Sequence, residues 1–92
     1  MIRSFKDKDS SRFFNGTRVA RFQAFAAQAV RRLTILDNAE ALRDLAGLRS
    51  NRLEALRGDR SGQYSIRINA QWRICFRWTD DGPCDVEKVD YH

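Results

Sequence analysis

The chain has 92 residues, of which 42% are hydrophobic and 32% charged, which is enough for one folded domain over residues 1–92 and excludes a disordered chain. No apolar run reaches transmembrane length and the first residues do not begin a signal peptide, so we expect a soluble, cytoplasmic protein with no membrane partner. The formal net charge is +5 and fourteen of the 17 basic residues are arginine, which favours nucleic acid as a partner, with a merely basic surface as the alternative.

The first sixteen residues predict two short elements. Residues 1–5 follow the period of a short N-terminal strand. Asp9 or Ser10 can cap a brief helix, and Asn15 with Gly16 can end it in the left-handed conformation that these residue types tolerate.

The main helix is predicted from about Arg21 to Asp37. We expect its apolar stripe to pack on a sheet, with a partner-binding face as the alternative. A further short helical segment begins at Asn38 or Glu40 and ends at Gly47. The residues of the stripe recur at three- and four-residue spacing, as on one face of a helix: Phe22, Phe25, Ala26, Ala29, Val30, Leu33 and Leu36.

A long polar connection over residues 48–62 follows the helices. Loops of this length inside a compact domain are usually functional or disordered. Residues 49–78 contain seven arginines and only two acidic residues, Glu54 and Asp59. Four of these arginines lie in the connection, which we therefore expect to be functional: Arg49, Arg52, Arg57 and Arg60.

Residues 63–78 predict a hairpin that reverses at Asn69 and Ala70. Period-2 alternation of aromatic and β-branched residues is typical of half-buried antiparallel strands. The other face carries arginines side by side, which should repel one another unless an anion lies among them. The expected core face holds Tyr64, Ile66, Ile68, Trp72, Ile74, Phe76 and Trp78, and the expected functional face holds Arg67, Arg73 and Arg77.

A turn at residues 80–83 leads to a final strand over residues 84–91. The element order predicts an α+β domain with helices on one face of a mostly antiparallel sheet. We expect Asp85 and Glu87 to lie outside the basic face or to pair with arginines, with a charged, protected edge strand as the alternative. Cys75 and Cys84 have no CxxC spacing and are expected to be reduced packing residues.

The only histidine, His92, is the last residue and would by itself be read as a solvated chain end. It follows Asp90 and Tyr91 on a strand predicted to lie beside the arginine-bearing strand. Glycine-rich phosphate loops and clusters of metal ligands are missing from the sequence, so we expect no cofactor and no metal.

This set of side chains suits RNA cleavage by attack of a 2′-hydroxyl on its own adjacent phosphorus. The reaction needs a proton acceptor, a proton donor and positive charge on the non-bridging oxygens. Arginine does not titrate near neutral pH, so Arg57 and Arg73 would stabilise phosphate charge. Asp90, Tyr91 and His92 would move protons or orient the group that does, and no metal is required.

Three stretches together resemble the HigB-type toxins of the RelE superfamily: MIRSF, NRLEALRGDRSGQYSIRINAQWRICFRW and VEKVDYH. The resemblance spans nearly the whole chain and implies a RelE-like fold, with helices on one side of a curved antiparallel sheet. It also implies an endoribonuclease that cleaves messenger RNA in the decoding site of the ribosome and arrests growth. The implied partners are a HigA-type helix-turn-helix antitoxin, the ribosome with its messenger, and operator DNA through the antitoxin alone.

The family's site residues carry over by position. Arg57 occupies a basic position where relatives often have lysine. Glu54 stands where some relatives have a histidine. Any acid–base role of that histidine would pass here to Glu54, His92 or ribosomal RNA. The resemblance implies catalytic roles for Arg57, Arg73, Asp90, Tyr91 and His92. The basic composition adds as RNA-binding candidates Arg49, Arg52, Arg60, Arg67 and Arg77.

Two other classes of function stay open from the sequence. A non-catalytic RNA-binding module would use the same arginines and exposed aromatic residues as a platform. A protein-interaction domain would use the basic face to meet an acidic partner. Removing Tyr91 and His92 separates the first from a nuclease, because a binding module would change only its affinity for RNA.

Overall fold

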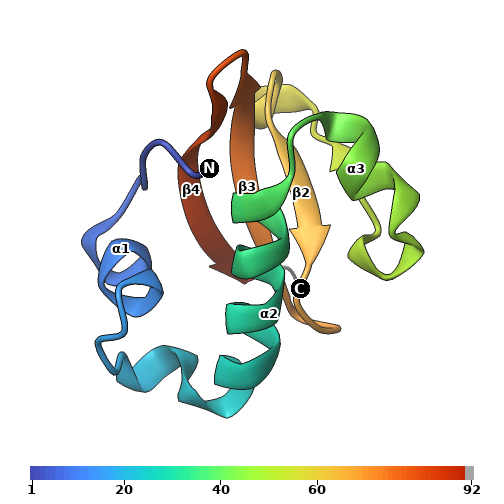
Figure 1. Cartoon of the computed structure of the whole chain (residues 1–92). Helices are drawn as coiled ribbons and strands as arrows, with labels where there is room; N and C mark the ends of the chain where they lie inside the picture. Colours follow the sequence, from blue (N-terminus) through green and yellow to red (C-terminus); the bar gives the residue numbers. More distant parts are fainter. Residues whose placement is uncertain (91–92) are drawn as a thin grey trace.

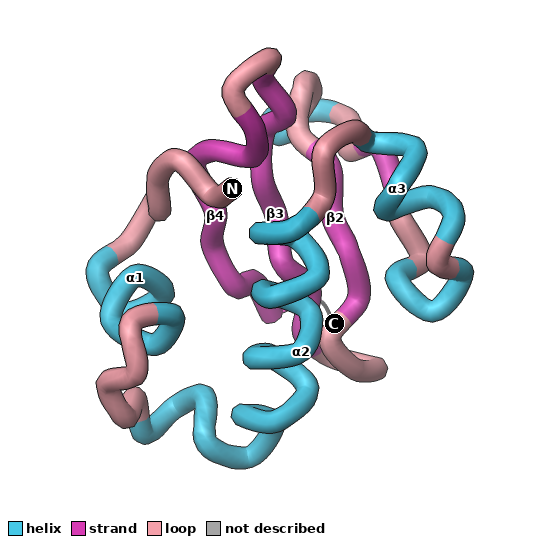
Figure 2. Tube along the Cα trace, in the orientation of Figure 1, coloured by secondary structure: helices cyan, strands magenta, loops and turns pink. Residues whose placement is uncertain are grey.

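The computed structural model describes residues 1–90 and has one four-stranded antiparallel sheet with helices against one face (Figure 1). The sheet order follows the chain, β1-β2-β3-β4. Helix α2 crosses in front of the sheet, α1 lies beside β4 and α3 lies beyond β2 (Figure 2). The predicted α+β class is therefore confirmed. Within the described residues, no helix is both long and apolar enough to cross a membrane.

The strands confirm the predicted hairpin and add a strand that the sequence did not reveal. Strand β2 (Tyr64–Arg67) pairs with β3 (Trp72–Thr79), and β3 pairs with β4 (Gly82–Asp90). The added strand, β1 (Glu54–Ala55), has only two residues and no usable alternation. The strand predicted at residues 1–5 was wrong in extent, because it is reduced to a single parallel bridge beside β4.

The reversal between β2 and β3 depends on the side chain of Asn69. Its Oδ1 accepts hydrogen bonds from the backbone N–H groups of Gln71 and Trp72, each at 2.8 Å. An asparagine that bonds the backbone two and three residues ahead mimics a turn of the main chain. This turn holds β3 in the register that places Arg67 opposite Arg73.

The short helices start at other caps than predicted. Helix α1 (Lys8–Phe14) is capped by Asp7, whose Oδ2 accepts from the Ser10 N–H at 3.0 Å, so the predicted caps at Asp9 and Ser10 were wrong by two or three residues. Helix α3 (Leu42–Gly47) begins later than predicted. The Asp44 carboxylate turns back to accept from two backbone N–H groups ahead of that helix, each at 3.0 Å.

The predicted main helix is divided in two. Residues 20–25 form a 3₁₀-helix, η1 (Ala20–Phe25), and the α-helix, α2 (Ala26–Asn38), follows it. In a 3₁₀-helix residues three apart lie on one line, which lets Phe22 and Phe25 both enter the core. Val30 was wrongly placed in the buried stripe, since its side chain is 52% exposed.

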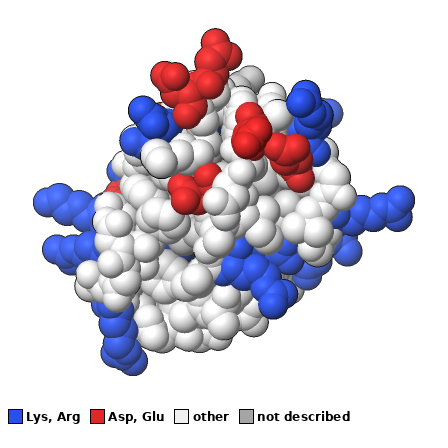
Figure 3. All heavy atoms as spheres, in the orientation of Figure 1, with Lys and Arg blue, Asp and Glu red and all other residues white. Residues whose placement is uncertain are grey.

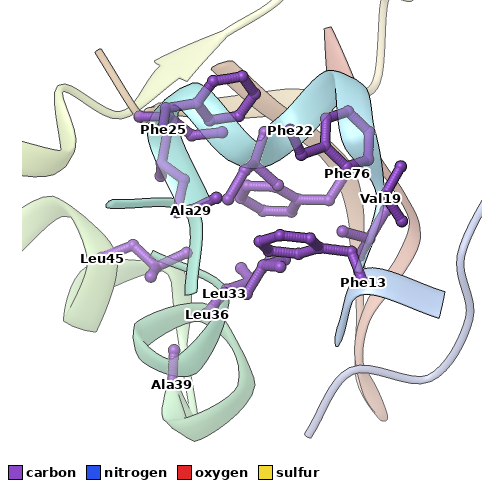
Figure 4. Close-up of a cluster of buried hydrophobic side chains, with 14 residues drawn as sticks. Phe13, Val19, Phe22, Phe25, Ala29, Leu33, Leu36, Ala39, Leu45 and Phe76 are labelled. Carbon is purple, nitrogen blue, oxygen red and sulfur yellow. The ribbon is translucent and has the colours of Figure 1, made fainter. Parts of the chain in front are cut away.

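The core lies between α2, η1 and the helix-facing side of the sheet (Figure 4). The Phe22 ring meets the Phe13 ring edge to face at 5.5 Å, and the Trp72 ring stacks on Phe25 at 4.9 Å. Aromatic pairs of this kind add about 0.5–1.5 kcal/mol beyond the burial of their area. Other fully buried members come from both layers: Leu33, Leu36, Ile66, Ile74, Phe76 and Val86.

Lys88 is a charged residue inside this core. It stands opposite Ile74 in the register and is 5% exposed. Its Nζ lies 4.1 Å from the ring centre of Phe22 and 4.5 Å from that of Phe13, and it donates no hydrogen bond to a residue within 1–90. Burial lowers the pKa of Lys88 to about 8, against the opposing pull of Asp7.

We predict that Lys88→Met raises the free energy of unfolding at pH 7 and removes the dependence of that free energy on the pH between 8 and 10.5. Because the folded pKa lies below the ordinary 10.5, the unfolded chain binds more protons between pH 8 and 10.5. The wild-type free energy of unfolding should therefore rise with pH across that window, by roughly 3 kcal/mol.

Urea unfolding at pH 7 to 10 tests this prediction. Lys8→Met, in the exposed first turn of α1, is the matched control and should keep the wild-type rise. Parallel pH profiles for the wild type and Lys88→Met would contradict it.

Candidate active site

Arg73 is the centre of the polar face of the sheet. Its strand neighbour Ile74 enters the core, so the Arg73 side chain leaves on the side away from the helices. The Nε donates to Ser65 Oγ at 2.7 Å, and Nη2 donates to the carbonyl of Arg52 and, at 3.4 Å, to that of Ser65. The side chain is only 11% exposed. These bonds hold the guanidinium in one orientation at the predicted position.

The carbonyl that Arg73 binds is held in place by a turn around a buried asparagine. Arg52 has a left-handed backbone with φ 46°, directly after the 3₁₀-helix η2 (Arg49–Asn51). The buried Asn51 donates from Nδ2 to the Leu45 carbonyl at 3.1 Å, and its Oδ1 accepts from Arg32 Nη1 at 2.8 Å. A chain of contacts thus connects α2 through the turn to Arg73.

Glu54 and Arg57 flank this centre on the connection. Glu54 begins β1 opposite Ser65, and its Oε1 lies 4.0 Å from Arg73 Nη1. Arg57 is exposed at the start of the 3₁₀-helix η3 (Gly58–Arg60), and its side chain has no hydrogen bond or ion pair within residues 1–90. The structure therefore brings Glu54 to Arg73 and leaves the Arg57 guanidinium available.

The other two arginines of the hairpin, Arg67 and Arg77, each have an acceptor within the fold. Arg67 Nε donates to the Asn69 carbonyl at 3.1 Å, and Arg77 Nε lies 3.7 Å from Asp85 Oδ2. Arg77 also lies against Gly62, where a Cβ would come within 2.9 Å of its Nη1. Arg67 is thus held by a neutral carbonyl and Arg77 by a carboxylate.

The acidic strand β4 supplies some of these acceptors. Asp85 pairs with Arg77, and Glu87 Oε2 accepts from Arg60 Nη1 at 3.2 Å and lies 3.4 Å from Lys6 Nζ. The prediction that these two acids pair with arginines is confirmed. Of the predicted RNA-binding arginines, Arg60 and Arg77 are thus partly neutralised. Arg49 and Arg52 are exposed at the η2 turn.

Cys84 directly precedes Asp85, the partner of Arg77. Burial and the nearby Asp85 raise the pKa of the Cys84 thiol, while Arg77 opposes the shift. Neither Cys84 nor Cys75 forms a disulfide, as predicted.

Asp90 ends β4. Of the predicted terminal group Asp90, Tyr91 and His92, it is the one residue that the structure describes. Its Cα stands opposite Trp72, a residue that packs on the helix side, whereas Val89 stands opposite Arg73. Gln71 Nε2 donates to Asp90 Oδ2 at 3.0 Å. Asp90 is therefore next to the Arg73 strand but offset from its polar face. Tyr91 and His92 lie outside the described residues.

Sequence reasoning missed the groups that position Arg73. Ser65 could have been identified from the alternation, which puts it on the arginine face across from Cys75. The roles of Asn51 and the Arg52 carbonyl have no local sequence signal, because they depend on the fold of a loop. Among residues 1–90, no three His, Cys, Asp or Glu side chains converge in a way that could hold a metal ion.

Sequence comparison identifies relatives over the full length of the chain. Residues 3–92 match the profile of a family described as the RelE-like toxin of the type II toxin–antitoxin system HigB. The chain is 38% identical over 82 residues to Toxin HigB-1 of Vibrio cholerae serotype O1, covering 87% of this chain and 86% of that protein. It is 31% identical over 93 residues to Endoribonuclease HigB of Proteus vulgaris, covering all of both.

Structure comparison agrees at the level of the fold. The YoeB–YefM complex from Staphylococcus aureus contains a chain that matches with a TM-score of 0.62 and 19% identity, covering 100% of this chain and 98% of that one. A YoeB/ParE toxin from Agrobacterium tumefaciens matches with a TM-score of 0.53 and 21% identity, covering 98% of each chain. From the family match over residues 3–92 and the two relatives above 30% identity, this chain belongs to the HigB-like family of RelE-like toxins of type II toxin–antitoxin systems.

Proposed function

We propose that this protein is an endoribonuclease that cleaves messenger RNA in the decoding site of the ribosome and so inhibits translation and growth. The single observation that carries the proposal is the guanidinium of Arg73, held on the polar face by Ser65 and the Arg52 carbonyl. A preorganised donor of this kind fits an anion that gains charge during a reaction better than a simple binding surface. The activity named for the relative from Proteus vulgaris supports the same reaction class.

The reaction proceeds without loss or gain of water. The 2′-oxygen gives its proton to a base and forms a bond to phosphorus, while the bond from phosphorus to the 5′-oxygen breaks. The leaving 5′-oxygen takes a proton from an acid, and a 2′,3′-cyclic phosphate remains. Proton transfers at both ends contribute about 10²–10⁴-fold each when the groups are well placed.

The roles follow from what each side chain can do. Arg73 and Arg57 stabilise charge on the non-bridging oxygens, because guanidinium groups stay charged at neutral pH. The acid and base come from Asp90, Tyr91 and His92, with Glu54 as a further candidate. Glu54 lies 4.0 Å from Arg73, a distance at which its carboxylate can also hold the guanidinium before RNA arrives.

The family description supplies the class of partner. A type II system pairs the toxin with an antitoxin protein, and we propose a HigA-type helix-turn-helix antitoxin as the neutralising partner in the cytoplasm. Operator DNA would be contacted through that antitoxin alone. The basic stretch over residues 49–78 then serves RNA: the messenger and the ribosomal RNA around it.

We predict that Arg73→Ala lowers the rate of messenger cleavage on programmed ribosomes by roughly 10²–10³-fold, as expected for loss of one preorganised donor. Arg73→Lys should recover only part of the rate, because an ammonium cannot bridge Ser65 and Arg52 with a planar fork. Arg12→Ala, in the last turn of α1, is the control and should cleave like the wild type. Wild-type rates for Arg73→Ala at equal folded concentration would remove Arg73 from the mechanism.

Asn51 is predicted to be a positioning residue for Arg73. Asn51→Ala leaves the Leu45 carbonyl and Arg32 without a buried partner and should cost about 1–3 kcal/mol of stability. Below the unfolding transition it should lower kcat more than it raises KM, and it should shift the ¹⁵N resonance of Arg73 Nε. Thr34→Ala, which removes only an exposed bond to the Val30 carbonyl within α2, should change neither. An unchanged Arg73 resonance in Asn51→Ala would make the residue purely structural.

Deleting His92 is predicted to reduce cleavage strongly while leaving binding to ribosomes and the free energy of unfolding nearly unchanged. The reason is that imidazole is the group here whose ordinary pKa lies nearest neutrality. Cleavage of messenger on programmed ribosomes, measured beside ribosome binding, separates chemistry from affinity. If the deletion weakens both equally, or neither, His92 is not the proton donor and the non-catalytic RNA-binding alternative gains support.

A further inference from the structure

A basic groove runs along the edge of the sheet between α2 and the β2–β3 turn. Two adjoining cavities of about 200 and 340 Å³ share Arg32 and Ile68 as walls. Neither cavity has an aspartate or glutamate among its described lining residues. In the view of Figure 3 basic side chains lie over the middle of α2, while the acidic ones gather in the upper part of the molecule. The polar residues that line the groove are Gln28, Arg31, Arg32, Ser50, Arg52, Arg67 and Asn69.

No carboxylate within residues 1–90 forms an ion pair with the arginines of this groove. Arg32 donates to the neutral acceptors Ser50 and Asn51, and Arg67 donates to a backbone carbonyl. The guanidinium groups of Arg31 and Arg52 have no hydrogen-bond or ion-pair partner within residues 1–90.

Four arginines outside the groove do have acidic neighbours. Carboxylates lie within 4.0 Å of each of Arg21, Arg60, Arg73 and Arg77. The pKa of Arg32 is lowered by its burial and by Arg31, so these like charges oppose one another. An anion bound in the groove would relieve this repulsion.

We propose that this groove binds the backbone phosphates of RNA next to the cleaved bond, so that α2 takes part in substrate binding through Arg31 and Arg32. The proposal rests on the function proposed above. Two contacts join the groove to the reaction centre. The Arg52 carbonyl accepts a hydrogen bond from Arg73, and Arg67 stands opposite Arg73 in the register. A strand of RNA with its scissile phosphate at Arg73 would therefore continue past these residues.

The shape and chemistry of the groove favour RNA over an acidic protein segment. The larger cavity, about 340 Å³, is of the size that holds a small ligand, and its wall includes the buried, apolar Ile68. Asn69 also lines this cavity, and its side-chain N–H₂ group has no hydrogen-bond partner within the described chain. Amide donors beside arginine forks suit phosphate oxygens and base edges of single-stranded RNA.

The first arm of the test measures binding without cleavage. The probe is a short single-stranded RNA with 2′-O-methyl groups, which lacks the attacking hydroxyl. The double variant Arg31→Gln/Arg52→Gln should bind it roughly tenfold more weakly, and the slope of log affinity against log salt should fall by about 1.4. Arg31→Lys/Arg52→Lys should keep most of the slope. Arg12→Gln, on the far side near β4, is the matched control and should match the wild type.

The second arm measures binding to vacant ribosomes and cleavage on programmed ribosomes. Weaker oligonucleotide binding assigns the groove to messenger phosphates and supports the proposal. Loss confined to vacant ribosomes would assign the groove to ribosomal RNA and overturn its placement next to the cleaved bond. Unchanged binding in both arms, with weaker binding to poly-glutamate, would assign the groove to an acidic protein and overturn it. Failure of the wild type to cleave would instead count against the proposed nuclease, since the binding arms need no catalysis.

Discussion

The hydrogen bonds of one buried guanidinium organise the polar face of this protein. Arg73 joins the middle strand to its neighbour through Ser65 and to the preceding loop through the Arg52 carbonyl. Because the side chain is 11% exposed, these bonds operate in an environment of lower dielectric than water, where they are stronger and more directional. Losing them would release both the loop and the charge that we propose for catalysis.

The loop can make this contact only because the helical layer holds it. Asn51 joins α3 to α2 by bonding the Leu45 carbonyl and Arg32, and the chain then turns through the left-handed Arg52. A non-glycine residue in this conformation costs free energy, which its surroundings must offset. The helices therefore contribute to the site as well as to the core.

The arginines divide into two groups with different electrostatic surroundings. On the β4 side, Arg60 and Arg77 meet Glu87 and Asp85, the latter on a bulge where the β3–β4 register shifts. Paired charges of this kind at the surface contribute little to stability but reduce the local potential. On the α2 side, the acceptors of Arg32 and Arg67 within the described chain are neutral. The positive charge of these side chains is therefore less compensated than that of Arg60 and Arg77.

The sequence by itself determined the β2–β3 hairpin and its two faces. Alternation along residues 63–78 requires one apolar side, and Ile66, Ile74 and Phe76 are indeed fully buried. Arg73 and Glu54 were identified as site candidates from residues and resemblance, and the structure brings them to 4.0 Å.

Only the tertiary structure decided what surrounds those residues. A hydrophobic period reports which side faces the core and says nothing of contacts between segments far apart along the chain. For that reason the strand β1, the Asn51 turn and the identity of Arg77 as the partner of Asp85 were absent from the prediction. The same holds for Lys88, which an alternating pattern cannot distinguish from a solvated lysine, but which packing places between the rings of Phe13 and Phe22. Local pattern determines the elements, while the partners of each charge depend on which elements meet.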